Sequence, residues 1–168
     1  MTIDIDERTH YLISGTLFAH KEPYVVTTVL GSCIAVTLFD PKTKIGGINH
    51  FMMPVWNGQG LPTPKYGNIA MKILLEKVIR LGASKDRLQA KVFGGAALYA
   101  EGSKILNIGG KNTVVAKEFL EENKIPVMGI DTGGNYGRRI QLFIETGKVT
   151  LKMLTNSAID RLKQKNAG

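Results

Sequence analysis

A period of two runs through residues 34–39, where Ile34, Val36 and Leu38 alternate with Ala35, Thr37 and Phe39, and this period predicts a β-strand. Residues 40–43 (DPKT) follow, and their aspartate and proline are typical of a tight turn. The apolar pattern then resumes over residues 44–53. Together these three segments predict an antiparallel β-hairpin.

The register of this hairpin determines which side chains meet. If Phe39 pairs with Lys44, then Cys33 lies directly opposite His50 on the same face of the sheet. Directly opposite residues have Cβ atoms roughly 4.5–5.5 Å apart, close enough for an imidazole to accept a thiol proton. A slip of one residue would turn His50 to the other face.

The rest of the chain alternates between short apolar runs and two amphipathic segments. A helix is expected over residues 66–81, ending at Gly82, and a second from Asn112, as its N-cap, to about residue 122. The fold class is therefore mixed α/β, a single layered domain of β-sheets with packed helices spanning residues 1–168. The further strands are expected over residues 11–15, 24–30, 87–93, 125–130, 138–146 and 148–154.

Composition narrows the class of protein. With 43% hydrophobic residues, one cysteine, an acidic N-terminus and no apolar run of about 20 residues, the chain is expected to be cytoplasmic and not inserted in a membrane. The formal net charge of +8 favours an acidic partner. Because the basic residues are scattered and no nucleic-acid-binding module is recognisable, an acidic protein surface is preferred over nucleic acid.

The single cysteine is the strongest candidate for chemistry. A histidine beside Cys33 would activate it as a nucleophile, whereas without that neighbour a lone cysteine is more often a small buried apolar residue. Gly31 and Ser32 precede it in a turn whose backbone N–H groups could form an oxyanion hole. The three histidines lie far apart and match none of the common zinc spacings, so no metal site is expected.

Several motifs along the chain resemble the CheD family of chemoreceptor glutamine deamidases. They are LGSC at 30–33, NHFM at 49–52, KVFGGAA at 91–97, NIG at 107–109 and DTGGNYGR at 131–138. The resemblance implies a layered α/β fold like that of bacterial deamidase toxins. It also implies an enzyme, a cysteine-dependent protein-glutamine glutaminase that needs no cofactor.

The resemblance also assigns roles to individual residues. Cys33 is implied to be the nucleophile, His50 the general base, and Thr27, six residues before the cysteine, the residue that orients His50. The implied partners are the cytoplasmic helices of chemoreceptors and a CheC-type chemotaxis phosphatase. Further residues are expected to contact the substrate: Gly31, Ser32, Asn49, Phe51, Asn135 and Arg138.

Four functions remain open from the sequence. The first is glutamine deamidation of chemoreceptors, and the second is a binding module that regulates a CheC-type phosphatase with little deamidation. A cysteine peptidase or amidase with another substrate is the third. The fourth is a basic nucleic-acid-binding protein, which would show a steep salt dependence.

Overall fold

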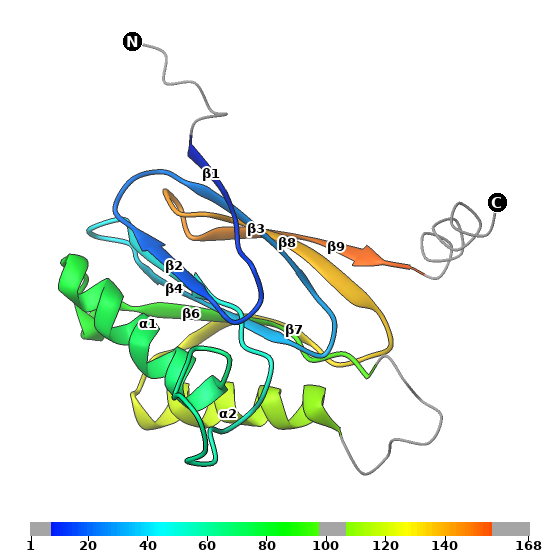
Figure 1. Cartoon of the computed structure of the whole chain (residues 1–168). Coiled ribbons are helices and arrows are strands. Elements are labelled where there is room, and N and C mark those ends of the chain that lie inside the picture. The colour runs from blue at the N-terminus through cyan, green and yellow to red at the C-terminus, as the bar shows by residue number, and fades with distance from the viewer. Residues whose placement is uncertain (1–7, 98–106, 156–168) are drawn as a thin grey trace.

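Two β-sheets and two α-helices form three stacked layers over residues 8–97 and 107–155, the part of the chain that the computed structural model describes (Figure 1). This arrangement confirms the mixed α/β class. The four-stranded sheet has the order β1 (Thr9–Tyr11), β3 (Val25–Leu30), β8 (Gly137–Phe143) and β9 (Lys148–Leu154). The five-stranded sheet has the order β2 (Leu17–His20), β5 (Ile45–Asn49), β4 (Ile34–Asp40), β6 (Gln89–Gly94) and β7 (Val127–Thr132).

The five-stranded sheet is the middle layer and is covered on both faces. The helices α1 (Gly67–Leu81) and α2 (Ile108–Glu122) pack on one face, and the four-stranded sheet packs on the other. Every residue of β4 is buried. Ile34, Val36 and Leu38 face the helices, whereas Ala35 joins the core between the sheets. Burying each of the large apolar side chains contributes roughly 1.5–3 kcal/mol.

The predicted hairpin is present, but its register differs from the predicted one by two residues. Phe39 pairs with Gly46 rather than with Lys44, and the prediction that Cys33 lies directly opposite His50 is therefore wrong. A shift of two residues keeps every side chain on its face, because the period of a strand is two. In this register Cys33 and His50 still share a face, but as diagonal rather than directly opposite residues.

Asp40 explains the change of register. Its buried carboxylate accepts hydrogen bonds from the N–H of Lys42 and of Ser84, and from Nε and Nη2 of Arg87. Burial by itself would raise the pKa of Asp40, but the Arg87 guanidinium and these N–H groups hold it below its usual range. Asp40 is therefore the last residue of β4, and the turn begins one residue later than predicted.

The helix expected over residues 66–81 is confirmed as α1, and Gly82 follows it with a φ of 122°. The second helix begins earlier than predicted. Its N-cap is Asn107, whose side chain accepts a hydrogen bond from the N–H of Gly110. Asn112 lies inside α2 and is fully buried, so the N-cap assignment was wrong. The terminal hairpin is confirmed as β8 and β9. The strand β2 was not predicted.

Candidate functional site

Cys33 lies between the ends of β3 and β4, where the chain crosses from the four-stranded to the five-stranded sheet. Its side chain is half-buried and packs against the core between the sheets. The carbonyl of Cys33 accepts a hydrogen bond from Gly95 N–H at 2.9 Å. The segment that carries the cysteine is thus fixed by the backbone that follows β6.

His50 directly follows β5 and is buried, with 3% of its surface exposed. Its neighbours Asn49 and Phe51 face the opposite way. Asn49 accepts from the N–H of Val36 and donates to the sulfur of Met71, and Phe51 packs in the core beneath the helices. The prediction that Asn49 and Phe51 contact substrate is therefore wrong, because strand alternation turns only His50 toward the layer that holds Cys33.

The threonine that contacts His50 is Thr28. Its Oγ1 lies 2.7 Å from Nδ1 of His50. Thr27 points to the other face of β3, where its hydroxyl accepts from Nε2 of Gln141. The assignment of Thr27 as the residue that orients His50 is therefore corrected to Thr28. The alternation of β3 was the signal that could have separated the two threonines, since Thr28 shares its face with the buried Val26 and Leu30.

The hydrogen bonds of Thr28 determine the protonation of the imidazole. The Thr28 hydroxyl donates to the carbonyl of Leu12 at 2.9 Å, and a carbonyl can only accept. The hydroxyl must therefore accept from His50, so Nδ1 carries the ring hydrogen. Nε2 of His50 is buried and has no hydrogen-bond partner among the described residues. In this tautomer Nε2 carries no hydrogen, and its lone pair can accept a proton.

Burial keeps both groups uncharged at neutral pH. It raises the pKa of the Cys33 thiol, an effect that the cysteine's own backbone N–H opposes. It lowers the pKa of His50 to about 4. The site therefore holds a neutral thiol and a neutral imidazole rather than a preformed ion pair, and the proton must move when the sulfur attacks.

Two glycines allow the backbone to approach the cysteine closely. Gly94 has a φ of 108°, and a Cβ there would overlap the carbonyl oxygen of Cys33. Gly95 has a φ of 67° and packs in the same way against Gly109 of α2. Among the described residues, no backbone hydrogen bond uses the N–H of Ser32 or Cys33 as a donor. These groups suit an oxyanion hole, which remains a prediction, as do the substrate contacts of Gly31 and Ser32.

Arg138 does not face solvent. It is 3% exposed, and its guanidinium donates to the Asp131 carboxylate at 2.9 Å and to the carbonyls of Gly94 and Gly133. The prediction that Arg138 contacts substrate is wrong, because its nitrogens hold the loop beside β6 and β7. Asn135 is exposed in that loop. Its contact with substrate remains a prediction.

Asn112 joins the two chain segments that carry Cys33 and His50. Its Nδ2 donates to the carbonyls of Ser32 and Met52, each at 3.1 Å. Its Oδ1 is buried without a partner among the described residues. Sequence reasoning missed the role of this residue, because no local pattern places the first turns of α2 beside the ends of two strands.

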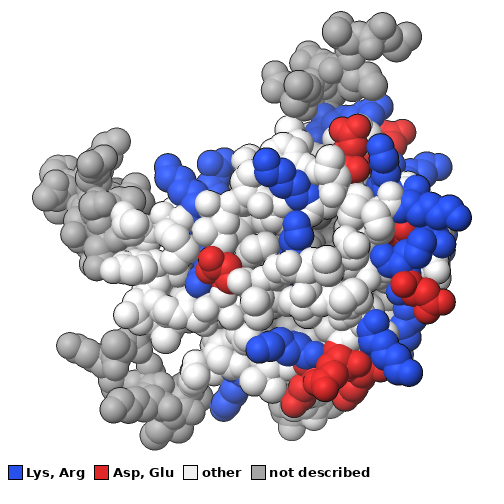
Figure 2. Space-filling view, turned by 180° about the vertical axis from the view of Figure 1, so that it is seen from behind, with Lys and Arg blue, Asp and Glu red and all other residues white. Residues whose placement is uncertain are grey.

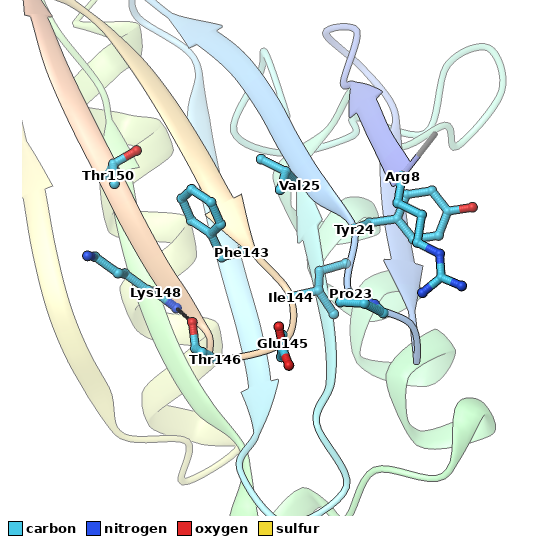
Figure 3. Close-up of a pocket in the computed structure, with 10 residues that line it drawn as sticks. All are labelled: Arg8, Pro23, Tyr24, Val25, Phe143, Ile144, Glu145, Thr146, Lys148 and Thr150. Atoms are coloured by element: carbon cyan, nitrogen blue, oxygen red, sulfur yellow. Dashed lines mark hydrogen bonds between the residues drawn. The ribbon is translucent and has the colours of Figure 1, made fainter. Parts of the chain in front are cut away.

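A cavity of about 460 Å³ lies at the opposite end of β3 from Cys33. Figure 3 shows Phe143 and Lys148 on one side of it, with Tyr24 and Arg8 on the other. None of the predicted site residues lines this cavity. The candidate site is therefore the layer between the sheets and not this cavity. No group of side chains suited to hold a metal ion occurs in the described part of the chain.

Charge is unevenly distributed over the surface. On the face that Figure 2 shows, lysine and arginine side chains gather toward one side, with acidic groups among them. A broad area with few charges lies beside them. In the described ranges, no helix is long and apolar enough to cross a membrane.

Comparison with known proteins gives consistent matches. The family model described as CheD chemotactic sensory transduction matches residues 52–153. Similar proteins named "Probable chemoreceptor glutamine deamidase CheD" occur in Trichlorobacter lovleyi, with 49% identity over 86% of this chain and 89% of that protein, and in Sulfurimonas denitrificans, with 42% identity over 84% and 92%. A solved structure, the hypothetical protein YfiH of Bacillus licheniformis, has a TM-score of 0.47 and 16% identity over 71% of this chain and 51% of that one.

Proposed function

The chain belongs to the CheD family, and we propose that it is a chemoreceptor glutamine deamidase in which Cys33 and His50 carry the reaction. The observation that carries this proposal is the buried hydrogen bond between Thr28 and His50. It leaves Nε2 as a bare acceptor in the same layer as the only cysteine of the chain. The proposal includes the role of Cys33 as the nucleophile.

The first step forms a thioester. Nε2 of His50 accepts the thiol proton as the sulfur attacks the carbon of a glutamine side-chain amide. The N–H groups of Ser32 and Cys33 stabilise the oxyanion of the tetrahedral intermediate. His50 then gives the proton to the leaving nitrogen, and ammonia departs.

The second step hydrolyses the thioester. A water molecule attacks the thioester carbon while Nε2 of His50 takes its proton. The bond to sulfur breaks, the proton returns to Cys33, and glutamate remains on the substrate. Thr28 keeps the hydrogen on Nδ1 throughout, the role of the third member in a catalytic triad. The proposed reaction uses no metal and no organic cofactor.

The proposed substrate is the helical cytoplasmic part of a chemoreceptor. A net charge of +8 attracts a partner rich in glutamate and speeds the encounter. Glutamine is preferred over asparagine, because a side chain shorter by one methylene leaves its amide further from a fixed sulfur. The cytoplasmic location that this substrate requires stays a prediction.

A binding module that only regulates a CheC-type phosphatase is the weaker alternative. Binding alone requires neither a bare imidazole nitrogen nor a buried threonine that fixes its tautomer. A CheC-type phosphatase as an additional partner remains compatible with the enzyme. A pull-down with the purified phosphatase tests it.

The deciding experiment incubates the protein with a receptor cytoplasmic fragment and maps glutamine-to-glutamate conversion by peptide mass spectrometry. Conversion that disappears in Cys33→Ala and in His50→Ala supports the proposal. Conversion that persists in Cys33→Ala excludes the cysteine mechanism. If a folded wild-type protein converts no glutamine in several receptor fragments, the phosphatase-binding alternative replaces the proposal.

A further inference from the structure

The hairpin that carries Cys33 and His50 loses its regular backbone pairing at the candidate site. Regular pairing between β4 and β5 ends at Thr37 and Ile48, and a single isolated bridge joins Ile34 to Phe51. Between these points, the N–H of Val36 is bonded by the side chain of Asn49 rather than by backbone. Two backbone hydrogen bonds close the isolated bridge, from the N–H of Ile34 to the carbonyl of Phe51 and from the N–H of Phe51 to the carbonyl of Ile34. Beyond the bridge, no backbone hydrogen bond among the described residues joins the two sides of the hairpin.

Asn112 supplies the missing connection from the helix layer. Ser32 and Met52 lie beyond the isolated bridge, on opposite sides of the hairpin. The two hydrogens of one Asn112 amide nitrogen bond the carbonyls of both. Ser32 is the residue before Cys33, and Met52 lies two residues after His50.

The chemistry of the amide makes this role specific to asparagine. Rotating the amide by half a turn would place Oδ1 against two carbonyl oxygens, so the contacts fix its orientation. An aspartate offers no hydrogen to either carbonyl, and an alanine offers nothing. Asn112 is fully buried, and its Oδ1 has no described partner. A buried orphan acceptor is unfavourable, so a residue kept for packing alone would be better apolar.

We propose that Asn112 is a positioning residue that sets the separation of Cys33 and His50 by clamping the carbonyls of Ser32 and Met52. Asn112 touches neither the sulfur nor the imidazole in the described contacts. Asn112 acts through the two carbonyls that it bonds, and its removal lets the chain segments of Ser32 and Met52 move apart. This inference rests on the proposed pairing of Cys33 with His50, but its test needs no receptor.

The test measures how fast iodoacetamide alkylates Cys33 across a range of pH. The sulfur displaces iodide, and at neutral pH His50 accepts the thiol proton. We expect Asn112→Ala and His50→Ala each to slow alkylation about tenfold or more at pH 7, since general-base assistance is lost. At high pH the thiolate forms without a base, and the rates of both variants approach that of the wild type.

The double variant separates positioning from general loosening. If Asn112 acts through His50, adding Asn112→Ala to His50→Ala slows alkylation no further. Asn123→Ala is the matched control, because Asn123 lies at the other end of α2 and also donates to a backbone carbonyl, that of Phe119. It should alkylate at the wild-type rate.

Any one of three alkylation results overturns the proposal. They are a wild-type alkylation rate in Asn112→Ala, an equal slowing by Asn112→Ala with and without His50, or the same slowing in Asn123→Ala. If Asn112→Ala does not fold, Asn112→Ser, which keeps one donor, should give an intermediate rate. If neither variant folds, Asn112 is required for the fold and the positioning role is rejected. A wild-type protein that alkylates as expected but deamidates no receptor fragment would overturn only the proposed function.

Discussion

Thr28 and His50 lie on different sheets, and the 2.7 Å contact between Oγ1 and Nδ1 joins those sheets inside the core. The threonine hydroxyl is itself held by the carbonyl of Leu12, so the imidazole rests on a chain of two hydrogen bonds. Such a chain fixes both the ring orientation and the tautomer. The pair is therefore the feature on which the chemistry of the site depends most directly.

Removing the Thr28 hydroxyl should lower turnover without weakening substrate binding. Thr28→Val keeps the shape of the side chain but leaves Nδ1 without its acceptor. We expect kcat to fall roughly 10- to 100-fold, because a misoriented His50 loses part of the rate enhancement that a general base usually supplies. Steady-state deamidation of a receptor fragment measures this effect. Thr27→Val is the control, because Thr27 contacts Gln141 on the other face. A larger loss in Thr27→Val than in Thr28→Val would return the orienting role to Thr27.

The low pKa of His50 predicts that activity is lost only at a pH well below the pKa of an ordinary histidine. Because burial holds this pKa at about 4, the imidazole stays neutral at pH 5, where an ordinary histidine is protonated. We expect kcat to change little between pH 7 and pH 5 and to fall as pH approaches 4. A single-turnover pH profile measures it. A midpoint near 6.5 would contradict the buried neutral base.

The same group links stability to pH. The pKa of His50 is lower in the folded than in the unfolded state, so the unfolded chain binds the extra proton. Stability should therefore be lost as pH falls from about 6.5 to about 4, by up to roughly 3 kcal/mol. Denaturant unfolding at several pH values measures it. His50→Gln, which does not titrate, should lose less stability over the same range.

Gly94→Ala should disturb the position of Cys33. Its Cβ would overlap the Cys33 carbonyl and would also require an unfavourable positive φ. Gly133→Ala is a matched control, because it has a φ of 84° but nothing within 4 Å of the added atom. We expect both to lose about 1–2 kcal/mol of stability through the backbone strain. A further loss of stability and of Cys33 alkylation should occur in Gly94→Ala alone.

Arg138→Gln tests whether this arginine is structural. The substitution leaves the carbonyls of Gly94 and Gly133 without a charged donor, and it should cost about 2–3 kcal/mol of stability. The adjacent Arg139→Gln is the control, because Arg139 is exposed. Thermal unfolding measures the difference. A raised KM at unchanged stability in Arg138→Gln would instead restore the predicted substrate contact.

Local patterns were sufficient where the neighbours of a residue are close in sequence. The amphipathic stripe and Gly82 predicted α1, and the alternation around Asp40 and Gly147 predicted two hairpins that the structure confirms. The same patterns placed Cys33 and His50 on one face. That conclusion survived a register error, because the error was two residues and a strand repeats every two.

What the sequence by itself determined is thus the class of fold and the faces of the strands, and it supplied one thiol and one histidine as candidates for the chemistry. The tertiary structure alone decided which threonine meets His50, which carbonyls Asn112 clamps and why Arg138 is buried. Each of these contacts joins segments that are adjacent only after the sheets stack and α2 docks. The physical reason is that hydrogen bonding and burial depend on distance in space, whereas sequence patterns report only the period of the local chain.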